Sequence, residues 1–232
     1  MPKVQRSPCG PEIVGPFAGE WAVDPTSDVD SVTSVSPSHE SSAESAPVLL
    51  VAPAKLTVSL RITGVRPDGL HTLDAEMVSL SLADMIELVP GGDGFVVEGA
   101  SGRVGAVADN LVSRALVLVG RRAGVRLRKE IPAGAGLGGG SSDAAAVLRW
   151  AGFDDVQAAA RLGADVPFCL AGGRARVRGI GEVIDPLPDE PRRLTLLTPP
   201  MGASTPAVYA RWDAMGGPIG HNGNDLEPAA LA

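Results

Sequence analysis

The stretch Ile131–Ala146, which has the sequence IPAGAGLGGGSSDAAA, predicts more about this chain than any other segment. It passes from a glycine-rich loop into an alanine-rich run, and its Ser141, Ser142 and Asp143 are candidate N-cap residues of a helix. The first N–H groups of a helix lack internal partners and carry partial positive charge, and glycine lets the backbone approach a ligand. The segment therefore predicts an anion site, most commonly for phosphate. A flexible turn with a helix cap is the alternative, although a turn needs only a glycine or two.

The composition predicts a globular protein with an aliphatic core. The 232 residues are 44% hydrophobic but only 3% aromatic. The net charge of −7 argues against a nucleic-acid binder. No apolar run reaches the ~18 residues of a membrane span, and the first residues do not resemble a signal peptide. Cys9 and Cys169 are expected to be unpaired thiols, which together with the other features favours a cytoplasmic protein without a membrane partner.

The chain divides into three segments by composition. Residues 1–46 are rich in Ser, Pro, Asp and Glu and are expected to form a disordered acidic tail. The prolines of Asp185–Pro191 indicate a boundary between one domain at 47–188 and a second at 189–232. Strands are expected first and helices later, which favours an α+β fold. The expected strands are 48–52, 56–63, 77–82, 85–89, 95–98, 125–129, 175–177, 183–184 and 194–197, and the expected helices are 111–119, one from the glycine loop to about 150, 156–162 and one from 204.

Three loop chemistries compete for the glycine-rich segment. A Walker A loop places a lysine and a Ser or Thr after its last glycine, but Ser141 follows Gly140 directly, which excludes that motif. A dinucleotide fingerprint fits Gly134–Gly139, yet it needs an acid at the end of a second strand. Asp154 and Asp155 have the spacing but precede a helix, which disfavours the dinucleotide interpretation. The third possibility rests on a resemblance.

The segment Pro132–Ala145 resembles the phosphate-binding motif of the GHMP kinases. Its triple glycine and Ser-Ser-Asp-Ala-Ala ending resemble the branch that acts on 4-diphosphocytidyl-2-C-methyl-D-erythritol. The resemblance implies a two-domain α+β architecture, with a ribosomal protein S5 domain 2-like N-terminal domain and an incomplete ferredoxin-like C-terminal domain. Other segments that resemble this branch, in the same order, are 52–56, 63–71, 109–112, 163–168 and 224–227.

The resemblance also implies that ATP is the phosphoryl donor and that Mg²⁺ accompanies it. A serine of the Ser141–Ser142 pair is expected to assist the phosphate or its metal ion, and the metal ligands stay unassigned. Asn110 is expected near the adenine, with capping of a helix as its alternative role. The loop residues expected to bind ATP are Pro132, Ala133, Gly134, Ala135, Gly136, Leu137, Gly138, Gly139, Gly140, Ser141 and Ser142.

By the same resemblance, Asp165 is the catalytic base and Lys55 orients the substrate hydroxyl beside it. From the residues alone, a turn or helix-terminus role is favoured for Asp165, and the resemblance reverses that preference. The alternative role of Lys55 is an ordinary charge on an edge strand. His71, Leu70 and Thr57 are expected to contact the substrate. Leu70 stands where the family has a tyrosine, so base stacking worth ~1–3 kcal/mol is absent at that position. Thr57 stands where the family usually has an asparagine and has a shorter reach.

The implied reaction is ATP-dependent phosphorylation of the 2-hydroxyl of 4-diphosphocytidyl-2-C-methyl-D-erythritol, in non-mevalonate isoprenoid biosynthesis. Two further departures from the family pattern are a shorter connection before Gly163 and the end of the chain soon after Asn224–Glu227, ahead of the family's second glycine-rich segment. The alternative expectation is therefore a truncated or degenerate relative that binds nucleotide without turnover.

Overall fold

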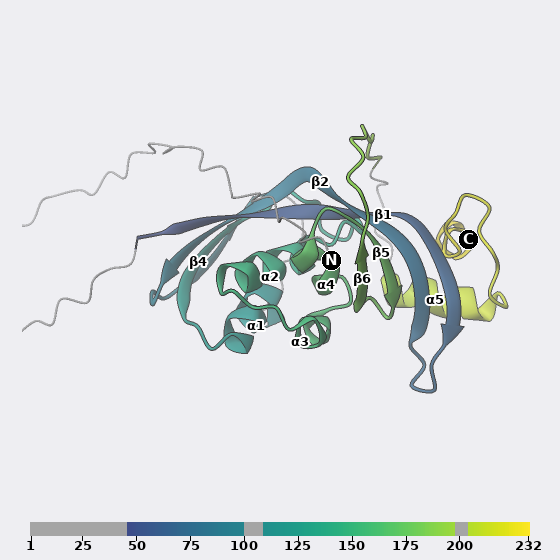
Figure 1. Ribbon diagram of the computed structural model, residues 1–232, viewed down its shortest axis with the longest axis horizontal. Coiled ribbons are helices and arrows are strands. Elements are labelled where there is room, and N and C mark those ends of the chain that lie inside the picture. The colour runs from purple at the N-terminus through teal and green to yellow at the C-terminus, as the bar shows by residue number, and fades with distance from the viewer. Residues whose placement is uncertain (1–45, 100–108, 198–203) are drawn as a thin grey trace, which may run out of the picture. The chain divides into compact units, whose positions relative to one another are not determined.

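The computed structural model describes residues 46–99, 109–197 and 204–232, which belong to one compact unit at 43–232. The tail expected at 1–46 lies outside the described residues, except for its last position. Strands and helices are mixed, as expected for an α+β protein (Figure 1). The elements are β1 (Val48–Val65), β2 (His71–Pro90), β3 (Phe95–Glu98), α1 (Leu111–Leu118), β4 (Ala123–Arg128), α2 (Gly139–Trp150), α3 (Val156–Leu162), α4 (Val166–Ala171), β5 (Arg174–Gly179), β6 (Val183–Pro186), α5 (Thr205–Ala214) and α6 (Glu227–Leu231).

The two longest strands form a hairpin on which the sheet is built. β1 pairs antiparallel with β2 along its length, from Val48 opposite Leu88 to Val65 opposite His71. The turn between them is closed by Gly69, whose φ of 83° is a conformation that glycine adopts without strain. The other edge of β2 pairs with β4 at one end and with β5 at the other. The remaining pairs are β3 with β4, which are parallel, and β5 with β6.

Helices α1 to α4 cover one face of this sheet (Figure 1). The alanines of α2 account for its close packing, because Ala144, Ala145 and Ala146 are almost fully buried. Small side chains let a helix approach a sheet closely, and larger residues then fill the space around it. Phe168 of α4 is 0% exposed and is the bulkiest fully buried side chain among the described residues. The rest of this core is aliphatic, as the composition predicts: Ile86, Leu88, Val112, Leu127, Val147, Leu148, Val166 and Val177.

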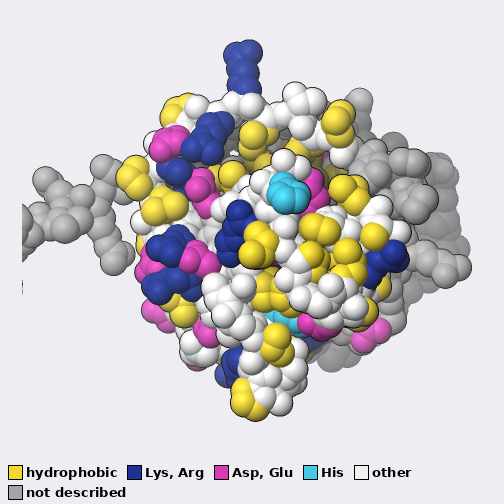
Figure 2. All heavy atoms as spheres, turned by 90° about the vertical axis from the view of Figure 1, so that its right-hand side faces the viewer, with side chains coloured by type: hydrophobic (Ala, Val, Ile, Leu, Met, Phe, Trp, Pro, Cys, Tyr) yellow, Lys and Arg dark blue, Asp and Glu magenta, His cyan; other side chains and the backbone are white. Residues whose placement is uncertain are grey.

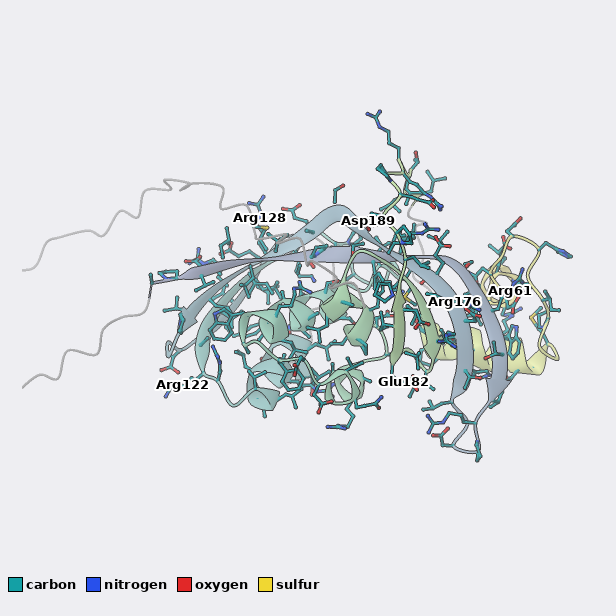
Figure 3. All side chains as sticks on the ribbon, viewed as in Figure 1. Arg61, Arg122, Arg128, Arg176, Glu182 and Asp189 are labelled. Atoms are coloured by element: carbon teal, nitrogen blue, oxygen red, sulfur yellow. The ribbon has the colours of Figure 1, made fainter. Side chains whose placement is uncertain are left out.

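The C-terminal segment is tied to the outer edge of β1 by a buried carboxylate. Asp225 is 4% exposed and accepts hydrogen bonds from the Arg61 guanidinium at 2.5 Å, the Ile62 N–H at 3.0 Å and the Gly220 N–H at 3.1 Å. Figure 3 shows Arg61 on β1 beside this segment. These contacts outweigh the burial that disfavours the charged form, so the pKa of Asp225 is lowered. The segment resembling the family at 224–227 therefore has a structural role here.

Several expected strand boundaries were wrong. Residues 48–52 and 56–63 belong to the single strand β1, which continues through Pro53. The register shift between Pro53 and Lys55 explains the difference, because proline is tolerated in a sheet where the ladder is irregular. Residues 77–82 and 85–89 likewise form one strand, β2. Residues 194–197 form no regular structure, since no neighbouring strand pairs with them.

The helix starts also differ from those expected. Gly138, in a left-handed conformation with φ of 67°, is the N-cap residue of α2, so Ser141, Ser142 and Asp143 lie inside the helix. The N-cap of α3 is Asp155, whose carboxylate accepts the Ala158 N–H at 2.9 Å. The apolar segment after 165 forms the short helix α4. A helix can thus begin at a glycine that precedes the capping residue expected from the sequence.

We expect Phe168→Ala to lower the free energy of unfolding by about 3–5 kcal/mol, because it leaves a cavity in a close-packed core. Val117→Ala on α1 is the matched control, since its side chain is 81% exposed and its loss changes stability by less than about 0.5 kcal/mol. Urea unfolding of both variants measures the difference. Equal losses would contradict the burial of Phe168.

Candidate active site

Lys55 and Asp165, far apart in the sequence, form an ion pair. The side chain of Lys55 is only 10% exposed, and its Nζ lies 3.3 Å from Oδ2 of Asp165 and 3.3 Å from Oγ1 of Thr57. Asp165 is the N-cap residue of α4, but its side chain makes no capping hydrogen bond. Its carboxylate therefore faces Lys55 and keeps a side-chain exposure of 32%, which leaves it accessible to a bound molecule.

The glycine-rich loop contacts this pair through the main chain of Lys55. The Lys55 N–H donates to the carbonyl oxygen of Leu137 at 2.9 Å. Gly138 packs on the Lys55 side chain so closely that a Cβ at this position would lie 2.7 Å from Lys55 Cγ. Gly134 and Gly136 also have positive φ, both 73°. The loop thus turns repeatedly toward the start of α2, where N–H groups without helical partners favour an anion.

The two serines in the first turn of α2 have different surroundings. Ser142 is 1% exposed, donates its hydroxyl to the carbonyl of Pro53 at 2.6 Å and lies 3.3 Å from Sγ of Cys169. Ser141 is half-buried, with its Oγ beside Gly163. The hydroxyl of Ser142 is thus engaged inside the protein, and only Ser141 keeps an accessible side chain. The sequence alone does not distinguish the two.

A cluster of three charged residues lies beneath the loop. Lys129, which follows β4, donates from Nζ to Asp84 on β2 and to Asp143 on α2, the latter at 2.7 Å. Asp84 is fully buried, and its Oδ1 accepts the N–H groups of Glu130 at 2.6 Å and Ile131 at 2.8 Å. Oδ1 of Asp143 is buried without a hydrogen-bond partner. None of these contacts is visible in the sequence, where Asp143 looks like a helix cap.

Burial dominates the electrostatics of this cluster. It raises the pKa of Asp143 to about 7 against the opposing charge of Lys129, and the negative charge of Asp84 adds to the rise. Burial also disfavours the ammonium of Lys129, but its two carboxylate partners outweigh that effect and raise the pKa of Lys129. Asp143 therefore changes its protonation near neutral pH.

Asn110 is placed at the start of α1 and caps it. Its side-chain oxygen accepts the Val112 N–H at 2.9 Å. Leu111, the next residue, lies beside the start of α2, because a Cβ at Gly140 would be 3.5 Å from Leu111 Cδ1. The capping role expected as an alternative is thus present, and the same position keeps Asn110 near the glycine loop.

His71 begins β2 and contacts helix α5, which sequence reasoning did not assign to the site. Its Nε2 lies 2.8 Å from Oδ1 of Asp213, and its ring centroid lies 4.8 Å from that of Tyr209 and 5.6 Å from that of Trp212. Leu70, the residue before it, is 49% exposed. Figure 2 shows hydrophobic side chains gathered on the side of the molecule that carries α5.

The charge of Asp165 acts on Tyr209 of this group. Burial and the neighbouring carboxylate of Asp165 raise the pKa of Tyr209. Composition is the feature of the sequence that could have pointed to Tyr209, because it is the only tyrosine in a chain with 3% aromatic residues. Trp212 follows it by nearly one helical turn, so both rings share a face of α5.

No group of three or more His, Cys, Asp or Glu side chains able to hold a metal ion occurs in the ranges that the structure describes. This does not conflict with Mg²⁺, which keeps several waters and takes most other ligands from substrate phosphates. Within the same ranges, no helix has both the length and the apolar character needed to cross a membrane.

Known proteins share both the sequence and the fold. The family of GHMP kinases N terminal domains matches residues 105–173, which include the glycine loop and Asp165. The 4-diphosphocytidyl-2-C-methyl-D-erythritol kinase of Paracoccus denitrificans is 47% identical over 161 residues, covering 68% of this chain and 58% of the relative. The enzyme of the same name from Rhizobium etli is 38% identical, covering 77% of this chain and 72% of the relative.

A solved structure agrees with these relatives. The crystal structure of a 4-(cytidine 5'-diphospho)-2C-methyl-D-erythritol kinase superposes with a TM-score of 0.54 at 38% identity, covering 71% of this chain and 64% of that one. The fold and the matched segment are those of a GHMP kinase.

Within that class, the chain belongs to the 4-diphosphocytidyl-2-C-methyl-D-erythritol kinase family, which confirms the resemblance seen in the sequence. It spans 58% to 62% of the length of the first three curated relatives. The boundary expected between 188 and 189 stays a prediction.

We expect Gly138→Ala to weaken nucleotide binding and to lower the melting temperature. The variant forces a Cβ into both a left-handed conformation and the Lys55 side chain. Gly152→Ala is the control, because Gly152 has a similar φ of 71° but nothing within 4 Å of the added Cβ. Calorimetric titration with an ATP analogue should show a larger effect for Gly138→Ala, and equal effects would mean that the contact with Lys55 is unimportant.

We expect Asp143 to make stability depend on pH between about 4 and 7. Its pKa is about 7 in the folded protein and 3.8 ordinarily, so in this window the folded state holds a proton that the unfolded chain has released. The stabilisation is complete below pH 4 and is lost as pH rises toward 7. Relative to Asp143→Asn, the native chain should lose at least about 1 kcal/mol across the window, measured by denaturant unfolding at each pH. Parallel profiles would contradict the shifted pKa.

Proposed function

We propose that this protein transfers the γ-phosphoryl group of ATP to the 2-hydroxyl of 4-diphosphocytidyl-2-C-methyl-D-erythritol, a step in non-mevalonate isoprenoid biosynthesis. The observation that carries the proposal is the pairing of Lys55 with Asp165 at 3.3 Å, on a lysine whose main chain is bonded to the glycine loop. The names of the curated relatives support the choice of substrate.

In the proposed reaction Asp165 is the general base. Its carboxylate accepts the proton of the 2-hydroxyl while the hydroxyl oxygen bonds to the γ-phosphorus and the bond to the β-phosphate oxygen breaks, releasing ADP. Lys55 holds the carboxylate in place and offsets negative charge near the reacting oxygen. Thr57, 3.3 Å from Lys55 Nζ, fixes the ammonium from the other side.

The ATP phosphates are proposed to lie against Pro132–Ser142. Main-chain N–H groups of the loop and of the first turn of α2 supply the donors, and Ser141 supplies the accessible hydroxyl. The role of Ser142 is to fasten the loop to β1 through Pro53. Asn110 is proposed to border the adenine. Mg²⁺ bound with ATP neutralises charge on the phosphates.

The cytosine is proposed to bind where His71 meets α5. Leu70 provides apolar contact, and the aromatic face that it lacks is available from Tyr209, whose ring lies 4.8 Å from that of His71. Base stacking on such a ring contributes ~1–3 kcal/mol. The effect of the Asp165 charge on the pKa of Tyr209 supports one continuous site for the substrate. A cytoplasmic location is part of the proposal, because the phosphoryl donor is ATP.

We expect Asp165→Asn to lower kcat by about 10²- to 10⁴-fold, because the amide cannot accept the hydroxyl proton. Asp155→Asn is the matched control, since this aspartate caps α3 and asparagine caps equally well. ATP consumption with the cytidyl substrate gives both rates. Equal rates for native and Asp165→Asn proteins would refute the assignment, and nucleotide binding without turnover in the native protein would favour the binding-only alternative.

A further inference from the structure

The charged cluster beneath the loop joins the two ends of the loop through one ammonium group. Asp84 binds the N–H groups of Glu130 and Ile131, where the chain enters the loop. Asp143 lies in α2, into which the loop leads. Lys129 donates to both carboxylates, so the entry and the exit of the loop share one partner.

The ammonium also touches the underside of the loop. A Cβ on Gly139, the first residue of α2, would lie 3.2 Å from Lys129 Nζ. The position of this glycine, and with it the direction of the first N–H groups of α2, therefore depends on where Lys129 is held. A positive charge at this place also adds to the attraction of a helix start for phosphate.

The cluster is costly for stability alone. It buries two carboxylates against one ammonium, and Oδ1 of Asp143 has no hydrogen-bond partner. Buried ion pairs are often replaced by apolar residues without loss of stability, whereas deleting one partner is strongly destabilising. A charged cluster of this kind is expected where it fixes a functional geometry.

We infer that Lys129, held by Asp84 and Asp143, is a positioning residue that sets the glycine loop in its phosphate-binding conformation. The effect of Lys129 on nucleotide binding rests on the proposed function. Its effect on the order of the loop can be measured without any nucleotide. Lys129 acts through the main chain of the loop and not by contact with the reacting atoms.

The test removes the hydrogen bond between Lys129 and Asp143 in α2 and keeps the pair of Lys129 with Asp84. The variant Asp143→Ala deletes the carboxylate that accepts from Lys129, and the variant Asp143→Asn keeps an uncharged acceptor at the same position. Asp225→Ala is the control, because it removes another buried carboxylate, which holds the C-terminal segment and not the loop. Thermal melting establishes that each protein is folded, and alanine at 143 continues an alanine-rich helix.

Amide hydrogen exchange on the nucleotide-free proteins gives the first readout. Asp143→Ala should speed exchange of residues 133–141 at least tenfold, Asp143→Asn should restore most of the protection, and Asp225→Ala should leave the loop unchanged. Unchanged loop exchange in Asp143→Ala overturns the inference. If this variant does not fold, Asp143→Ser replaces it in the same comparison, because the serine hydroxyl is too short to take the place of the carboxylate oxygen that accepts from Lys129. Unchanged loop exchange in that variant likewise overturns the inference.

Calorimetric titration separates the inference from the proposed function. Asp143→Ala should weaken binding of an ATP analogue about tenfold and leave the affinity for cytidine diphosphate unchanged. Equal losses for both ligands, or no loss for the ATP analogue, overturn the positioning role. A native protein that binds no ATP analogue refutes the proposed function instead, and the exchange result then still decides whether Lys129 orders the loop.

Discussion

The structure of the site depends on the placement of Lys55. Its N–H is bonded to the carbonyl of Leu137 in the glycine loop, its side chain packs on Gly138, and its ammonium reaches Asp165. One residue of β1 thus contacts both the glycine loop and the carboxylate at the start of α4. Charged groups in a poorly hydrated site interact strongly, so small displacements have large effects.

The irregularity of β1 makes this placement possible. Pro53 has no N–H to donate, and the register with β2 shifts between it and Lys55. The carbonyl oxygen of Pro53 accepts a hydrogen bond from the hydroxyl of Ser142. The bulged strand therefore contacts the loop at two points, through Ser142 and through Leu137, and a regular strand would offer neither in the same geometry.

The sequence predicts the motifs of the site well, because each is local. The glycine loop and the helix cap at Asn110 depend on the conformational preferences of a few adjacent residues. The α+β class follows from the order of the expected strands and helices, and the comparisons confirm it.

What the sequence could not predict depends on residues far apart in the chain. The cluster of Asp84, Lys129 and Asp143 joins two strands and a helix, so Asp143 resembled a cap. Tyr209 reaches His71 only because α5 packs at the end of the hairpin. The expected strand at 194–197 had suitable residues but has no strand to pair with.

The burial of Cys169 has a consequence for oxidative chemistry. Burial raises the pKa of the Cys169 thiol to about 11, and the carboxylate of Asp165 adds to the rise. Only the thiolate reacts readily with oxidants and alkylating agents. At neutral pH about one molecule in ten thousand carries it. The thiol of Cys169, one helical turn after Asp165 in α4, is therefore a poor nucleophile at neutral pH.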